Sequence, residues 1–381
     1  MPAEPRLAEL ADRIRLAMAQ DGGALPFSRF MELSLYEPEL GYYEHARVGR
    51  AGDFYTSVSV GPLFGELMAL QGALWFDGLE AAGADIGRPL HWVEAGAHEG
   101  RFAADFLGWL RRHRPDRYER IRYTIVEPSR RRREWQRATL EEFGDRVEWR
   151  EALPVFEGVF FGNELLDAFP IERFGWERAS GSWFRWGVHP RGAAFEWCRM
   201  PAGPLGGTPL DGLPAELLGV LPDGFTVECS PAAEAWWRSA ASRLRRGWMV
   251  TFDYGYEDSD RFRPERERGT LRGYREHRHV DDVLEQPGSI DLTAHVDFGR
   301  IAAVGEEAGL VTEGLESQRR FLTGLMAATL KPGATFGEWT AGRVRQFQTL
   351  THPQHLGHSF RVLVQKRNAA FFWVQTAHPE R

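Results

Sequence analysis

The chain has 381 residues, of which 43% are hydrophobic and 27% charged, a composition typical of a folded globular protein and not of a disordered one. Its formal net charge of −7 argues against a general nucleic-acid-binding protein, because phosphate contacts require an excess of basic residues. Two cysteines cannot build a disulfide framework, and the absence of any apolar run of about 18 residues predicts no membrane-spanning helix.

Residues 7–20 predict an amphipathic helix, because apolar residues recur at helical spacing until Gly22 and Gly23. Charged residues interrupt this segment, so it does not have the pattern of a signal peptide, and we expect a cytoplasmic protein. An aromatic, glycine-rich stretch then leads to a second apolar helix from about Pro62 to Leu79. We expect residues 1–88 to form an N-terminal, mostly helical cap.

From Pro89 onward, short apolar runs alternate with helical segments, a pattern that predicts parallel strands with crossover helices. The predicted strands comprise residues 90–96, 122–128, 146–152, 158–164, 248–256, 311–317 and 359–367. We therefore expect residues 89–381 to form an α/β core with a Rossmann-like, seven-stranded sheet.

Two segments interrupt this core. Residues of about 171–230 predict a β-rich insertion, with turns at Ser180-Gly181 and at 190–192, and residues of about 257–297 predict a polar loop. The helix that follows the first insertion contains Trp236 and Trp237 at adjacent positions. One of these two side chains should therefore lie in the core, while the other faces the cap or the insertion.

In an open parallel sheet the ligand lies at the carboxyl ends of the strands, which draws attention to the first two strand ends. Gly96 and Gly100 flank the turn after Glu94, and Glu127 ends the next strand, where an acidic side chain can bind ribose hydroxyls. Alternatively, Glu127 only caps the helix that begins near Ser129. Neither the G-x-x-x-x-G-K-[ST] nor the G-x-G-x-x-G motif is present, so a nucleoside without phosphates, such as S-adenosylmethionine (SAM), fits this pattern better than a nucleotide.

The strand at 158–164 ends in Asn163 and Glu164, with Asp167 three residues later. If a helical turn starts here, the two carboxylates share one face and can bind a guanidinium through charge-assisted hydrogen bonds. The alternative is that they only stabilise the N-terminus of a helix. The histidines near the C-terminus do not have the regular spacing of metal ligands, so we expect no metal site.

Six segments of the chain, in the same order, resemble the MidA family, class I methyltransferases related to a mitochondrial complex I assembly factor. The resemblance extends from about Leu25 to Arg367. The segments are LGYYEHARVGRAGDFYTSVSVGPLFGELM, VEAGAHEGRFAADFL, YTIVEPSRRRREWQ, GNELLDAFPIERF, VTFDYGY and GTLRGYREHRHVDDVLEQPGSIDLTAHVDF. This resemblance implies a SAM-binding core and, as in the mitochondrial relative, a protein arginine methyltransferase.

The resemblance also implies roles for individual residues. Glu94, Gly96, Gly100 and Glu127 would bind SAM, and the cap residues Asp53, Phe54 and Thr56 would fold across it. Asn163, Glu164 and Asp167 would line the acceptor side. Four residues of the long loop would border the substrate entrance: Arg272, Asp291, Thr293 and His295.

The chain departs from the family pattern at two places. His98 and Glu99 replace the central glycine and arginine of the family's E-x-G-P-G-R-G loop, and Val58-Ser59 replaces a Pro-Glu pair in the cap motif. The alternatives to a protein methyltransferase are therefore a SAM-binding assembly factor or chaperone without turnover, and a small-metabolite methyltransferase. We expect a protein substrate, no nucleic-acid partner, and a possible homodimer through aromatic residues of the insertion.

Overall fold

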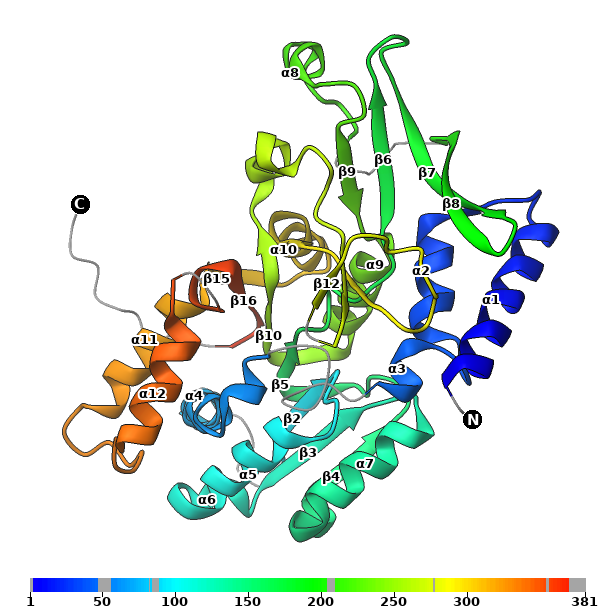
Figure 1. Ribbon diagram of the computed structural model, residues 1–381. Helices are drawn as coiled ribbons and strands as arrows, with labels where there is room; N and C mark the ends of the chain where they lie inside the picture. Colours follow the sequence, from blue (N-terminus) through cyan, green and yellow to red (C-terminus); the bar gives the residue numbers. More distant parts are fainter. Residues whose placement is uncertain are drawn as a thin grey trace.

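The computed structural model describes residues 3–46, 56–81, 83, 89–203, 210–276, 278–353 and 356–369, with only the backbone described at 258 and 259. A large mixed sheet crosses the centre of the molecule, a second, antiparallel sheet extends from one end of it, and the N-terminal helices lie beside both (Figure 1). None of the helices described is both long enough and apolar enough to span a bilayer.

The main sheet has the strand order β15-β16-β10-β5-β2-β3-β4, and the two-residue strand β14 (Val296–Asp297) pairs with the end of β10 as an eighth strand. Strands β2 to β5 and β10 are parallel, whereas β16 runs antiparallel to both of its neighbours, β10 and β15. The bounds are β2 Leu90–Ala95, β3 Ile121–Val126, β4 Val147–Arg150, β5 Phe156–Asn163, β10 Leu244–Tyr256, β15 Val311–Ser317 and β16 Phe360–Arg367. Each predicted core strand therefore forms, although β10 begins at Leu244 and not at 248. Strand order reverses between β2 and β5, which is where such sheets bind ligands.

Alternating side chains of the central strands pack on opposite faces of the sheet. Trp92 and Phe161 belong to one hydrophobic cluster, while their neighbours Val93 and Phe160 belong to another. The first face is covered by α4 (Leu63–Ala81), α5 (Arg101–His113), α7 (Arg130–Leu140) and α11 (Gln318–Thr329), and the second by α9 (Pro231–Arg243) and α10 (Phe298–Glu307). The sheet is thus buried on both sides, as its nearly continuous apolar strands require.

Helix α4 packs with the core, although we expected it within the cap of residues 1–88. Its side chains are buried almost all round, including Phe64, Trp75 and Phe76, and they join the cluster that covers the main sheet. A helix that is apolar on every side cannot lie on the surface of a cap, because it must be enclosed by other elements. Of the helices in residues 1–88, those that pack apart from the main sheet are α1 (Ala3–Gln20), α2 (Phe27–Tyr36) and α3 (Tyr42–His45).

The first insertion forms an antiparallel sheet, as its pattern predicted. Its order is β1-β7-β6-β9, with β8 also paired to β7, and its first strand comes from the N-terminal segment. The bounds are β1 Leu25–Pro26, β6 Glu172–Glu177, β7 Ser182–Arg191, β8 Ala194–Pro201 and β9 Thr226–Cys229. Because β1 pairs with β7, the N-terminal segment and the insertion form one continuous structure.

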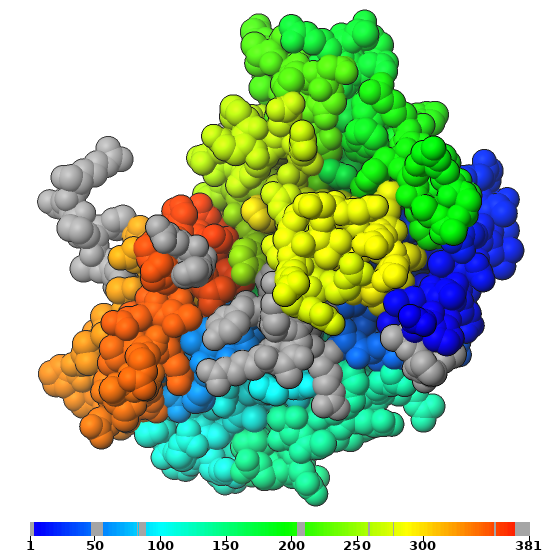
Figure 2. All heavy atoms as spheres, in the orientation of Figure 1, coloured from blue at the N-terminus to red at the C-terminus, as the bar shows by residue number. Residues whose placement is uncertain are grey.

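The second insertion adds a small sheet of β12 (Arg278–Val280), β11 (Arg272–Arg275) and β13 (Asp291–Thr293). Its apolar residues Leu271, Ile290 and Leu292 share a hydrophobic cluster with Leu10 of α1 and Val188 of β7. In Figure 2 this yellow segment lies against both the blue N-terminal helices and the green strands. Three segments that are distant in sequence therefore support one another beside the carboxyl ends of the main strands.

The remaining helical segments are short or peripheral. They are α6 (Pro115–Tyr118), α8 (Ala215–Val220), α12 (Ala341–Thr351), α13 (Leu356–Ser359) and the 3-10 turns Val58–Val60, Glu141–Arg146, Asp258–Phe262 and Pro264–Arg266.

Candidate functional site

A cavity of about 1270 Å³ lies at the carboxyl ends of β2, β3 and β5, beneath α2 and α3. It is larger than the roughly 300–1,000 Å³ of a site for one small molecule. The cavity therefore has room for a nucleoside cofactor together with part of a second molecule. Of the residues expected to bind the cofactor or the substrate, those that line it are Thr56, Glu94, Gly96, Glu127, Asn163, Glu164, Asp167, Asp291 and Thr293.

The glycine turn after β2 opens its backbone to this cavity. Gly96 is exposed and has a φ of 74°, whereas its neighbours Ala95 and Ala97 are buried. Gly100 also has a positive φ of 82°, but it lies against Leu140 of α7, where it precedes the first residue of α5. The two glycines therefore serve different purposes: Gly96 faces the cavity, and Gly100 permits close helix packing.

His98 and Glu99, the residues that depart from the family pattern, line the cavity without filling it. Histidine at 98 adopts a φ of 50°, a left-handed conformation that a glycine would reach at less cost. The Glu99 carboxylate forms an ion pair of 3.0 Å with Arg101 at the start of α5.

Glu94 is buried at the end of β2, where its carboxylate accepts a hydrogen bond of 2.6 Å from the hydroxyl of Tyr123. Burial raises the pKa of Glu94 to about 8, although the bond from Tyr123 acts in the opposite direction. The carboxyl therefore holds a proton more readily than an exposed glutamate does.

Glu127 directly follows β3, and both of its carboxylate oxygens are held. The backbone N–H of Ser129 donates to one oxygen at 2.9 Å, and the side-chain amide of Gln136 donates to the other at 3.3 Å. Ser129 itself caps α7 by accepting from the N–H of Arg132. Gln136 also donates to the carbonyl of His98 at 3.0 Å, so it ties Glu127 to the glycine turn. Sequence reasoning missed Gln136, because a glutamine inside a helix carries no motif.

Glu164 lies in an irregular turn and not in the helical turn that its spacing allowed, since its φ is 51°. Its backbone N–H donates to the carbonyl of Phe252 at 2.8 Å. Its carboxylate accepts from the amide of Asn163 at 2.9 Å and from the N–H of Ser57 at 3.2 Å. Burial, and then the neighbouring carboxyl of Asp167, raises the pKa of Glu164 to about 8. The amide oxygen of Asn163 is buried and has no hydrogen-bond partner within the part of the chain that is described.

Asp253 of β10 organises the turn that carries these side chains. One of its oxygens accepts from the N–H groups of Leu165, Leu166 and Asp167 at 3.1, 2.8 and 3.2 Å, and the other accepts from Tyr254 at 2.9 Å. Asp253 is fully buried, and burial raises its pKa to about 8. Sequence reasoning missed it, although an aspartate inside the otherwise apolar run VTFDYGY was a usable signal.

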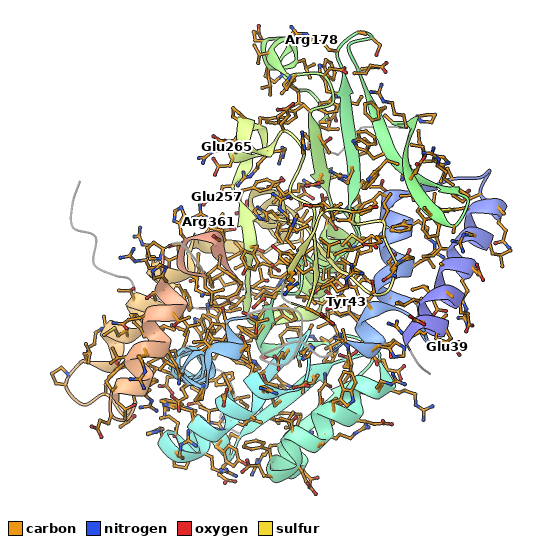
Figure 3. The ribbon with its side chains drawn as sticks, in the orientation of Figure 1. Glu39, Tyr43, Arg178, Glu257, Glu265 and Arg361 are labelled. Atoms are coloured by element: carbon orange, nitrogen blue, oxygen red, sulfur yellow. The ribbon has the colours of Figure 1, made fainter. Side chains whose placement is uncertain are left out.

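Asp167 is almost fully buried, and its pKa is raised well above the ordinary value by burial and then by the carboxyls of Asp253 and Asp291. Asp291 comes from β13 and accepts a hydrogen bond of 2.7 Å from the hydroxyl of Tyr43, which is labelled in Figure 3. Tyr36 of α2 donates to the carbonyl of Ala168 at 2.9 Å. The three segments thus meet around one group of carboxyls.

The N-terminal helices are also joined to the side of the cavity that Glu127 and α7 form. Arg132 of α7 donates to the carbonyl of Tyr43 at 2.8 Å and lies over its ring at 4.9 Å. Ser129 donates to the carboxylate of Glu44 at 2.9 Å. Thr56 lines the cavity through a turn in which it exchanges hydrogen bonds with Ser59.

Three of the expected site residues are not brought to the cavity wall in the described structure. Arg272 is exposed on β11, and Gly100 lies behind the turn. His295 borders a separate small pocket beside Cys229, and burial lowers its pKa to about 4. Strand β13 ends at Thr293, which lines the cavity. His295 lies beyond the end of the strand, so it does not continue the alternation that places Asp291 and Thr293 on the cavity side. Asp53 and Phe54 lie outside the described residues.

A sequence profile matches residues 71–316 of the chain, and its family is described as "Putative S-adenosyl-L-methionine-dependent methyltransferase". Two curated relatives bear the name protein arginine methyltransferase NDUFAF7 homolog, mitochondrial. The Caenorhabditis elegans protein is 27% identical over 83% of this chain and 75% of its own length. The Drosophila melanogaster protein is 27% identical over 100% of this chain and 88% of its own length. These names contradict the cytoplasmic location that we expected from the absence of a signal peptide.

Two crystal structures from Burkholderia thailandensis share the whole fold. Each is 30% identical to this chain and covers 100% of it and 98% of the other chain, with TM-scores of 0.82 and 0.80. The second of them contains bound S-adenosyl-homocysteine, the product that SAM leaves after methyl transfer.

Proposed function

The chain belongs to this family of SAM-dependent methyltransferases, and on that premise we propose that it methylates an arginine side chain of a partner protein. The observation that carries the proposal is the half-buried carboxyl of Glu164 and the buried carboxyl of Asp167, which line the same cavity as Gly96 and Glu127. When such carboxyls ionise away from bulk water they need a partner of opposite charge, and a guanidinium provides one with paired N–H donors.

The residues beside the glycine turn fit SAM. A side chain at Gly96 would place its Cβ 3.2 Å from Leu165, so glycine keeps this part of the cavity open. The Glu127 carboxylate lies at the cavity wall, where it can accept hydrogen bonds from the two hydroxyls of a ribose. When bound, SAM supplies an activated methyl group on its sulfonium.

The protein's task in such a displacement is to align the acceptor nitrogen and to exclude water. Glu164 and Asp167 would hold the guanidinium N–H groups, and the amide oxygen of Asn163, which has no partner among the described residues, would accept a further N–H. Methylation of a guanidinium nitrogen replaces one N–H by N–CH3 and releases one proton. A carboxylate with the raised pKa of Glu164 is suited to take that proton from the nitrogen.

The test uses Glu164→Gln, which keeps the shape of the side chain but removes its charge. We expect about a ten- to hundredfold loss of transfer, since a hydrogen bond to a charged group contributes about 1.5–3 kcal/mol. Transfer is measured from methyl-labelled SAM to proteins of a cell lysate, followed by amino-acid analysis for methylarginine. Binding of S-adenosyl-homocysteine, measured by calorimetry, should stay within about threefold.

Glu316→Gln is a matched control, because this half-buried carboxyl on β15 pairs with Arg320 away from the cavity. It should retain full transfer. Methyl label in a residue other than arginine would refute the proposed acceptor, and full activity of Glu164→Gln would refute the role of the carboxylate.

A further inference from the structure

The cavity has an aromatic wall next to its carboxyls. Trp236 of α9 lines the cavity, and its ring lies 5.9 Å from Phe169 and 5.3 Å from the buried ring of Phe160. Its neighbour Trp237 is fully buried and donates to Gln365 at 2.9 Å. One of the two adjacent tryptophans therefore lies in the core, as the sequence predicted, and the other lines the cavity.

Two connections place this wall beside the acidic group. Phe169 follows Asp167 by two residues in the same turn, and Tyr36 donates to the carbonyl of Ala168 between them. Phe169, Trp236 and Tyr36 all line the cavity that contains the carboxyls of Glu164 and Asp167. The indole of Trp236 packs between the rings of Phe160 and Phe169, so this part of the wall is formed by the fold itself, before any acceptor binds.

An aromatic wall beside carboxyls favours a guanidinium over an ammonium group. A guanidinium is planar and weakly hydrated, so it can stack on an aromatic face while its edge donates to carboxylates, whereas an ammonium is a strongly hydrated point charge. The indole of tryptophan has the most favourable face for such a contact. An acceptor arginine that reaches Glu164 would also need an apolar surface for its three methylene groups.

We propose that Trp236 determines acceptor specificity by packing its indole face against the guanidinium and methylene stem of the incoming arginine. The inference rests on the proposed function for the identity of the acceptor. In its simplest form it predicts that the cavity binds an arginine side chain when no methyl transfer can occur.

The binding test uses the full chain loaded with S-adenosyl-homocysteine and labelled with 15N at its tryptophan indoles. The probes are Nα-acetyl-arginine methylamide and its citrulline analogue, which has nearly the same shape but no charge. We expect the Trp236 indole signal, assigned with Trp236→Phe, to shift with the arginine probe only. The inference would be overturned if the arginine probe did not shift the Trp236 signal, or if the citrulline probe shifted it by the same amount.

The kinetic test measures methyl transfer by the wild type, Trp236→Ala and Trp236→Phe. The reaction uses methyl-labelled SAM and the protein substrate identified in the lysate. We expect Trp236→Ala to raise the KM for the protein acceptor about tenfold, or about 1.4 kcal/mol, with little change in kcat. Trp236→Phe should retain most of the affinity, because it keeps an aromatic face. Trp183→Ala is the control, since this half-buried tryptophan of β7 packs on Trp176 outside the cavity.

The two proposals fail in different ways. If the wild-type protein methylates arginine but Trp236→Ala has an unchanged KM, only the role of Trp236 is wrong. If the arginine probe shifts the Trp236 signal but no methylarginine forms in any protein, the cation site stands and the proposed function is wrong.

Discussion

Replacing Asp253 by alanine should loosen the turn that carries the carboxyls of Glu164 and Asp167. In the folded protein one oxygen of Asp253 accepts three successive backbone N–H groups, those of Leu165, Leu166 and Asp167, and the other oxygen accepts that of Tyr254. Alanine provides none of these acceptors. The turn would then keep only its weaker contacts, such as the bond from Glu164 N–H to the carbonyl of Phe252.

The magnitude follows from which of these N–H groups can reach water. Leu166 and Asp167 are buried, so their N–H groups would lose a partner without replacement, at about 1–3 kcal/mol each. Leu165 and Tyr254 are partly exposed and can bond to water. Removal of a carboxyl whose burial opposes its ionisation offsets part of this cost. We expect a net loss of about 2–4 kcal/mol in the free energy of unfolding.

Urea unfolding followed by tryptophan fluorescence measures the stability, and hydrogen exchange at residues 165–167 measures the turn itself. Thr251→Val is the matched control, because Thr251 lies on the same strand and its buried hydroxyl has no partner among the described residues. It should be as stable as the wild type or slightly more so. Asp253→Ala with wild-type stability and unchanged exchange at 165–167 would refute the reasoning.

Two further predictions concern the glycine turn and the pH dependence. Gly96→Ala should weaken S-adenosyl-homocysteine binding about tenfold, measured by calorimetry, because alanine disfavours a φ of 74° and its Cβ would crowd Leu165. Gly181→Ala is the control: Gly181 has a φ of 60° with open space around it, so this variant should bind the ligand normally. Stability should fall as pH rises from about 4.5 to 8, because in this range the unfolded chain releases the protons of Glu164 and Asp253 while the folded protein retains them. Glu164→Gln removes one of these groups, so its urea midpoint should fall less steeply over that window, and an equal slope would contradict the assignment.

The strands of the core could be predicted because their apolar runs are short, regular and separated by helical lengths. The predicted bounds for 90–96 and 311–317 agree closely with β2 and β15. Placement of α4 could not be predicted in the same way, since a helix that is apolar on all sides indicates burial but not the surface against which it packs.

The candidate site was predictable where its residues follow strand ends, as at Gly96, Glu127 and Asn163. Gln136 and Asp253 act through hydrogen bonds to backbone groups of other segments, and no spacing in the sequence reveals such bonds. The turn after Asn163 shows the same limit. Two carboxylates three residues apart fit a helix, but the bonds from the turn to Asp253 fix another conformation with Glu164 at positive φ.

The hydrophobic cluster shared by α1, β7 and β13 constrains the order in which the chain folds during synthesis. Arg6 donates to the carbonyl of Gly288, 282 residues further along the chain, and Leu10 shares its cluster with Leu292. On the ribosome, strands β2 to β5 emerge and can pair while α1 and α2 still expose their apolar faces. In the nascent chain, the cavity wall to which Asp291 contributes can therefore form only after this residue has left the exit tunnel. A chain truncated before that point leaves the apolar faces of α1 and α2 exposed, and such faces promote aggregation.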